Sequence, residues 1–96
     1  MKRPSDCEDM QDIRKEIDGI DGEIIALLGR RFQYVQAAAQ FKASSGAVRA
    51  PERVQAMLQQ RRCWAEKAGL SPDIIEKIYC DLVNYFVSEE MKKWKK

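Results

Sequence analysis

Residues 10–42 read MQDIRKEIDGIDGEIIALLGRRFQYVQAAAQFK, and this stretch decides the fold. Apolar residues recur through it in steps of three and four, which is the period of one face of an α-helix. They are Met10, Ile13, Ile17, Ile20, Ile24, Leu27, Leu28, Phe32, Val35 and Ala38. Ser5 and Glu8 stand at capping-box spacing before this run. The pattern predicts one helix of roughly 35 residues, or about 50 Å at 1.5 Å per residue. A small chain does not cover so long a helix by itself, so we expect a second copy to do so.

Two further helices are predicted after this one. Residues 43–50 are rich in serine and alanine, contain one glycine, and predict a loop. Pro51 suits the first turn of a second helix, which is expected to end near Gly69. Ser71 and Pro72 then form an N-cap and first-turn pair for a third helix. No strand pattern or repeat is present, so we predict an all-α fold.

Composition excludes several classes of protein. The chain has 96 residues, which predicts a single helical domain over residues 1–96. The formal net charge of +2 indicates neither a nucleic-acid partner nor a membrane surface. No signal peptide or membrane span is predicted. Three cysteines without a CxxC motif, and no histidine, predict reduced thiols, no metal site and a cytoplasmic protein. The C-terminal lysine run is interpreted as a solvated helix end; it comprises Lys92, Lys93, Lys95 and Lys96.

Three cations interrupt an otherwise apolar seam of the long helix. In steps of three and four, the seam reads Arg14, Ile17, Asp21, Ile24, Leu28, Arg31, Val35, Ala38 and Lys42. A buried cation without a partner is costly. The seam therefore predicts either interhelical ion pairs with snorkelling side chains or a bound anion. Periodicity alone leaves both alternatives open.

The length of the helix limits which cations can share one ligand. Arg31 and Lys42 are about 16 Å apart along a helix axis, within reach of one small dianion. Arg14 and Lys42 are about 42 Å apart, so one helix cannot bring both to that ligand. An antiparallel partner helix that crosses near residues 24 and 25 would place the partner's Arg14 beside Arg31 and Lys42. This geometry predicts a homodimer with two shared sites.

Arg53 and Glu90 complete the set of candidate site residues. Arg53 lies one turn into the second predicted helix and is equally consistent with an exposed helix arginine. Glu90 lies on or near the inward stripe of the third helix, where it suits either a salt bridge or a site. Without histidine or paired carboxylates, acid–base or covalent catalysis has few candidates. Arginine and lysine in an apolar pocket instead suit binding a dicarboxylate and stabilising charge that develops on an oxygen.

Several short motifs resemble the helical chorismate mutase family. They are Asp12-Ile13-Arg14, Ile17-Asp18-Gly19-Ile20-Asp21, Leu28-Gly29-Arg30-Arg31 and Phe41-Lys42. Other segments resemble, more specifically, the isochorismate pyruvate lyases of salicylate and siderophore biosynthesis. These segments are Pro4-Ser5-Asp6-Cys7, Ala50-Pro51-Glu52-Arg53-Val54, Met57-Leu58 and Trp64-Ala65. Each motif is weak by itself, but their order and spacing cover nearly the whole chain.

The resemblance implies an intertwined all-α homodimer with two equivalent active sites. Arg14 would come from one protomer, and Arg31, Lys42, Arg53 and residue 90 from the other. The arginines would hold the two substrate carboxylates, and Lys42 would donate to the ether oxygen whose bond breaks. The implied reaction converts isochorismate to salicylate and pyruvate in a concerted pericyclic step, with a weaker chorismate mutase side activity. It implies no metal or organic cofactor.

Three positions depart from the patterns of these relatives. Helical chorismate mutases carry acidic residues near positions 50 and 54 that meet the chorismate ring hydroxyl, whereas this chain has Ala50 and Val54. Losing those contacts favours isochorismate. At position 90 the lyases have glutamine and this chain has Glu90. The alternatives are a dedicated chorismate mutase, or a non-catalytic helical dimerisation module in which Asp21 and Glu90 pair with the cations.

Overall fold

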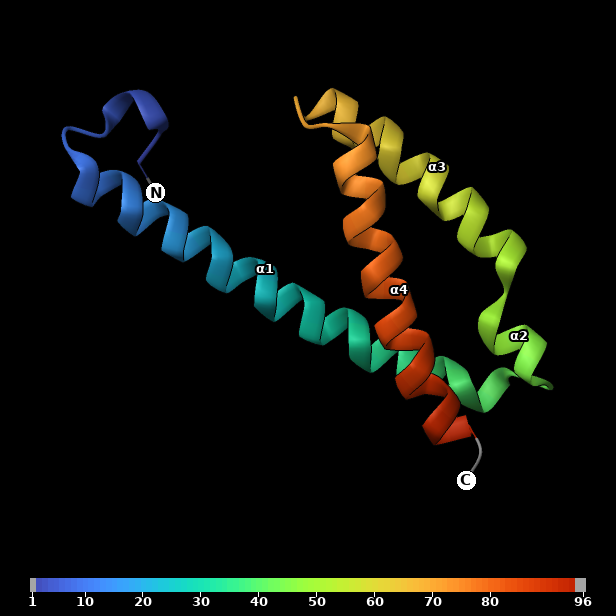
Figure 1. Ribbon diagram of the computed structural model, residues 1–96. Coiled ribbons are helices and arrows are strands. Elements are labelled where there is room, and N and C mark those ends of the chain that lie inside the picture. The colour runs from blue at the N-terminus through green and yellow to red at the C-terminus, as the bar shows by residue number, and fades with distance from the viewer. Residues whose placement is uncertain (1, 95–96) are drawn as a thin grey trace. The chain divides into compact units, whose positions relative to one another are not determined.

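The computed structural model describes residues 2–94, and these residues are helical without any strand (Figure 1). The elements are η1 (Pro4–Asp6), α1 (Met10–Ala38), η2 (Ala39–Phe41), α2 (Ser45–Arg49), α3 (Pro51–Lys67) and α4 (Pro72–Trp94). The predicted all-α fold built on three long helices is confirmed. Lys95 and Lys96 of the lysine run lie outside the described residues. No helix in residues 2–94 combines the length and hydropathy needed to cross a bilayer.

The chain divides into two compact units, Met1–Gln33 and Tyr34–Lys96. In the first unit, α1 begins at Met10 and not at the predicted capping box. The Oδ1 atom of Asp9 accepts the N–H of Asp12 at 2.9 Å, so Asp9 caps the helix. The capping-box prediction is wrong because Asp9 stands directly before the helix, whereas Ser5 falls within η1.

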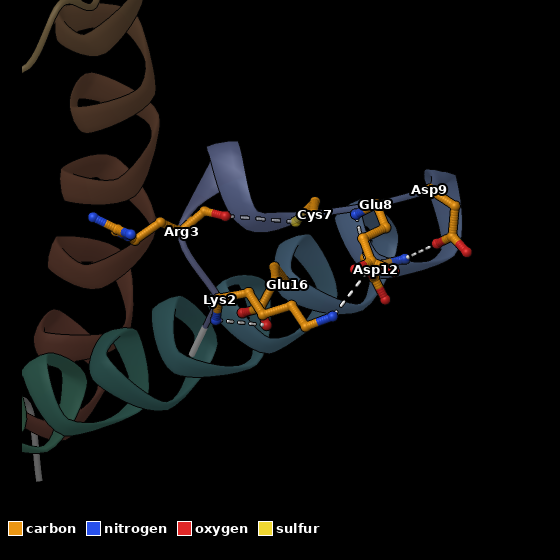
Figure 2. Close-up of polar contacts among 7 residues, drawn as sticks. All are labelled: Lys2, Arg3, Cys7, Glu8, Asp9, Asp12 and Glu16. Carbon is orange, nitrogen blue, oxygen red and sulfur yellow. Dashed lines mark hydrogen bonds and ion pairs between the residues drawn. The ribbon is translucent and has the colours of Figure 1, made fainter.

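The residues before α1 fold back onto its first turns (Figure 2). The Lys2 ammonium lies 3.0 Å from Asp12 Oδ2, and the Lys2 N–H donates to Glu16 at 3.2 Å. The N–H of Glu8 also donates to Asp12, at 3.1 Å. The Glu8 N–H and the Lys2 ammonium hold the pKa of Asp12 below its usual range. The contact with Asp12 raises the pKa of Lys2. These polar contacts fix the N-terminal segment on α1.

The apolar face of the first unit is uncovered. Among residues 2–33 no side chain is buried, in contrast to the ordinary helix of a globular domain. Seven large apolar side chains of this unit are exposed: Met10, Ile13, Ile17, Ile20, Ile24, Ile25 and Leu27.

The second unit has a core between α3 and α4, which form a helical hairpin (Figure 1). Met57, Leu58 and Val83 are buried together, and Val54, Tyr79, Cys80 and Val87 pack around them. The turn between the two helices is as predicted. Gly69 takes a positive φ of 79°, and the N–H of Leu70 donates to the Ala65 carbonyl at 2.8 Å. Ser71 Oγ accepts the N–H of Ile74 at 3.3 Å and caps α4.

The segment between α1 and α3 differs from the predicted loop. Ser45–Arg49 form the short helix α2, whose N-cap Ser44 accepts the Ala47 N–H at 3.2 Å. Ala50 ends α2 in the left-handed region, with φ 40°, a conformation that favours glycine. The long helix also stops earlier than predicted, because α1 gives way to the 3₁₀ turn η2 after Ala38.

Candidate active site

Lys42 lies where η2 ends and the chain turns toward α2. Its backbone is extended, with φ −93° and ψ 132°, and its N–H donates to the Ala39 carbonyl at 3.2 Å. The side chain is 26% exposed. Its ammonium donates to the Ala47 carbonyl at 3.3 Å and to Glu90 Oε2 at 3.3 Å. Segments from α2 and α4 therefore meet at this ammonium.

Glu90 is the one charged residue that is buried among residues 2–94, with 3% of its surface exposed. It lies on α4 one turn after Phe86, which is equally buried. A buried carboxylate needs a partner, and Lys42 supplies it. The expectation that Glu90 faces inward toward a cation of the seam agrees with this contact. The separation of 3.3 Å between the Lys42 ammonium and Glu90 Oε2 is longer than a tight charge-assisted hydrogen bond, and the same ammonium also donates to the Ala47 carbonyl.

The structure places the predicted arginines elsewhere than in this contact. Arg53 is exposed on the first turn of α3, in the same unit, and takes no part in the Lys42–Glu90 pair. Arg14 is exposed and Arg31 is half-buried on α1, in the first unit. The Lys42–Glu90 contact is formed wholly within the second unit. Of the five predicted site residues, the structure thus brings these two together.

Sequence reasoning missed two groups around Lys42. One is the Ala47 carbonyl, which reaches the ammonium because residues 45–49 are helical. The other is the indole of Trp94, whose Nε1–H donates to the Lys42 carbonyl at 3.0 Å. Trp94 looks like one more apolar position of the third helix. The signal that points to it is its N–H, because a half-buried indole usually finds an acceptor.

The arrangement suits charge stabilisation at an oxygen. An ammonium that is fixed by a buried carboxylate and a carbonyl can donate to a substrate oxygen with little reorganisation. The carboxyl group of Glu90 accepts hydrogen bonds when ionised and donates one when protonated. In residues 2–94, no group of three or more Cys, Asp or Glu side chains is arranged to hold a metal ion.

Comparison with known proteins gives matches along most of the chain. Residues 13–91 match the family model for chorismate mutase type II. An isochorismate pyruvate lyase from Pseudomonas aeruginosa is 46% identical over 95 residues, which is 99% of this chain and 94% of that protein. A T-protein from Haemophilus influenzae is 46% identical over 72 residues, 74% of this chain but 19% of that protein. A T-protein from Enterobacter agglomerans is 36% identical over 67 residues, 69% of this chain and 18% of that protein.

Proposed function

Because the chain belongs to the chorismate mutase type II family, we propose that it is an isochorismate pyruvate lyase, which forms salicylate and pyruvate. The observation that carries this proposal is the similarity to the Pseudomonas lyase, which extends over nearly the full length of both proteins. The T-proteins resemble this chain over only about a fifth of their own length. The similarity to the lyase therefore supports the proposed activity more strongly than the similarity to the T-proteins supports an alternative one.

The reaction needs binding and charge stabilisation more than acid–base catalysis. The C–O bond between the ring and the enolpyruvyl group breaks, and a ring hydrogen moves to the enolpyruvyl methylene carbon. The ring becomes aromatic as salicylate, and the enolpyruvyl group leaves as pyruvate. Negative charge develops on the ether oxygen during this step. The protein must hold a compact dicarboxylate and donate to that oxygen.

Lys42 is the proposed donor to the ether oxygen. Its side chain is half-buried and its ammonium is already anchored at two acceptors, which supports this role. A partly desolvated charge acts more strongly on a nearby oxygen than one in bulk water. When substrate enters, the ammonium can turn from the Ala47 carbonyl to the ether oxygen without leaving Glu90.

Glu90 has two proposed roles that depend on its proton. As an anion it orients the Lys42 ammonium, but it repels charge that grows on the ether oxygen. As a neutral acid it donates to that oxygen. We therefore expect turnover to fall as pH rises, with the loss of one proton.

The proposed site is shared between two copies of the chain. Arg14, Arg31 and Arg53 would hold the two substrate carboxylates, with Arg14 supplied by the partner. The exposed apolar face of the first unit supports this assembly, since water contacts it in a single chain. An intertwined homodimer would cover that face and carry the partner's Arg14 toward Lys42.

Isochorismate is the proposed substrate because of two residues at the start of α3. Ala50 joins α2 to α3, and Val54 packs against the α3–α4 core. Neither side chain can bind a hydroxyl group. A ring hydroxyl placed as in chorismate would lose the acidic partners that mutases provide at these positions.

The cytoplasm is the proposed compartment of the protein. Its cysteines, Cys7, Cys63 and Cys80, are free thiols.

A direct assay tests the proposed function. Purified protein is incubated with isochorismate, and salicylate and pyruvate are measured by fluorescence and by a coupled dehydrogenase. We expect equal amounts of the two products. A parallel incubation with chorismate measures prephenate. Prephenate as the main product, with little salicylate from isochorismate, would favour a dedicated mutase, and no turnover of either substrate would favour a non-catalytic module.

A further inference from the structure

One helix holds residue 42 at both its backbone and its side chain. The Lys42 carbonyl accepts the Trp94 indole N–H at 3.0 Å, and the Lys42 ammonium lies 3.3 Å from Glu90. Glu90 and Trp94 are four residues apart on α4 and therefore lie on the same face, one turn apart. Two successive turns of α4 thus contact Lys42, one at its side-chain ammonium and the other at its backbone carbonyl.

The backbone contact satisfies two groups that would otherwise lack partners. Lys42 has left the helical conformation, so its carbonyl does not continue the hydrogen-bond pattern of η2. Trp94 is half-buried, and its N–H needs an acceptor there. The two groups are 52 residues apart in sequence and meet in a part-buried position. A lost partner in such a place is costlier than at the surface.

The hydrogen bond of the indole lies beside a space in which the ring is not closely packed. Beside the ring lies a cavity of about 410 Å³, lined by Trp94 together with Gln36, Ala39 and Gln40 among others. A ring that borders a cavity lacks van der Waals partners on that side. The N–H of Trp94 is therefore its most specific contact with the segment that carries Lys42.

We propose that Trp94 is a positioning residue for Lys42. Its indole N–H fixes the backbone from which the flexible lysine side chain extends, so that the ammonium reaches the reacting oxygen. This inference rests on the proposed function of Lys42. The anchor at the carbonyl does not use the ammonium. It therefore persists when the ammonium leaves the Ala47 carbonyl for the substrate, which is when accurate placement matters most.

The test removes the N–H and keeps the shape of the ring. The chain has two tryptophans, and Trp64 is 52% exposed on α3, so Trp64→Phe leaves Trp94 as the single indole. In this parent, Trp94 is replaced biosynthetically by benzothienylalanine, which has sulfur where the indole has N–H. We expect kcat to fall about tenfold, the effect of one lost hydrogen bond at the reacting geometry, with KM changed less than about twofold. An unchanged kcat would show that ring packing suffices and would overturn the proposal.

Two further measurements separate this inference from the proposed function. In Trp64→Phe/Lys42→Gln, the same replacement at Trp94 should cause no additional loss of turnover. An equal tenfold loss in both backgrounds would show that Trp94 acts independently of Lys42 and would overturn the proposal. Hydrogen exchange of the Trp94 indole N–H, measured by NMR in Trp64→Phe, tests the bond without any activity. Slow exchange is expected; exchange as fast as that of the exposed Trp64 indole in a Trp94→Phe protein would overturn the anchor. Full turnover in Lys42→Gln would reject the catalytic role of Lys42, whatever the exchange rate shows.

Discussion

The two units of the chain treat their apolar side chains in opposite ways. In residues 34–94, seven hydrophobic residues are buried: Ala39, Val48, Met57, Leu58, Ala65, Val83 and Phe86. In residues 2–33 none is buried, and Ile17 and Ile24 remain 50% and 48% exposed. The second unit therefore has a core of its own, whereas the first presents an exposed apolar face that the proposed partner copy would cover.

This difference also divides the candidate site residues. Lys42 and Glu90, which contact each other, belong to the unit with a core. Arg14 belongs to the unit without one. The proposed donor to the ether oxygen is thus held within one chain, whereas the proposed substrate binding by Arg14 is expected to depend on assembly.

The largest effect is expected from a charge on the uncovered face of α1. Ile24→Asp should prevent dimer formation and reduce lyase activity to background, because an unpaired carboxylate would be buried against the partner. Sedimentation at micromolar concentration should show a shift from dimer to monomer. Gln33→Asp is a matched control on the opposite face of the same helix and should remain dimeric. A fully active Ile24→Asp protein would show that lyase activity does not depend on a partner copy packed against this face.

Lys42→Gln should lower kcat by about 100- to 1,000-fold, as expected for one lost donor to a developing oxyanion. KM should change much less, because the lysine contributes mainly in the transition state. Circular dichroism should show an intact fold. Lys92→Gln removes a charge from an exposed lysine of α4 and should leave kcat unchanged. A loss confined to KM would reassign Lys42 to substrate binding.

A smaller, pH-dependent effect is expected at Glu90. Glu90→Gln keeps a donor at every pH and should flatten the pH profile, so that activity persists in alkaline solution. Wild type and variant are compared by kcat from pH 5 to pH 9. Glu89→Gln, which alters the neighbouring carboxylate beside Lys92, should retain the wild-type profile. Identical profiles for wild type and Glu90→Gln would remove Glu90 from the mechanism.

The smallest effect is expected at Asp12. The pKa of the Asp12 carboxyl is lowered in the folded protein. The contacts of Asp12 therefore stabilise the N-terminal segment fully at pH values above the pKa of Asp12 in the unfolded chain. This stabilisation is lost as the pH falls through the lowered pKa of the folded protein. The protection of the Glu8 N–H against hydrogen exchange, corrected for the intrinsic pH dependence of exchange, should therefore decrease in acid. Asp12→Asn should show lower protection at neutral pH with less acid dependence, and Asp18→Asn, which alters an exposed carboxylate of α1, should behave as wild type. Equal acid dependence in Asp12→Asn would assign the effect to another group.

Residues that cap or end helices predicted the helix boundaries correctly where no neighbouring residue could take the same position. Gly69 and Ser71 mark the α3–α4 turn because a left-handed glycine and a serine cap each act within a few residues. The capping box at Ser5 failed because Asp9 competes for the same helix start. The loop prediction for residues 43–50 failed because Ser44 caps residues 45–49 as α2, and this helix ends at Ala50 in a left-handed conformation that alanine does not favour.

The sequence predicted the part of the candidate site that follows from burying a charged side chain. The position of Glu90 on the inward stripe predicted that it faces cations of the seam, and the structure shows Lys42 as its partner. Trp94 was not anticipated, because its bond to the Lys42 carbonyl depends on where η2 ends. The roles of Arg14, Arg31 and Arg53 depend on a substrate and a second copy, and stay predictions.

Mixing two inactive variants tests the shared site most directly. Arg14→Ala and Lys42→Ala homodimers should each be nearly inactive, because every site lacks one of the two cations. After subunit exchange, a mixed dimer carries both lesions in one site and none in the other. With equal amounts and random exchange, activity should return to about a quarter of wild type, since half of the dimers are mixed and each has one intact site of two. No recovery after confirmed exchange would contradict the account, because Arg14 would then not act across the interface.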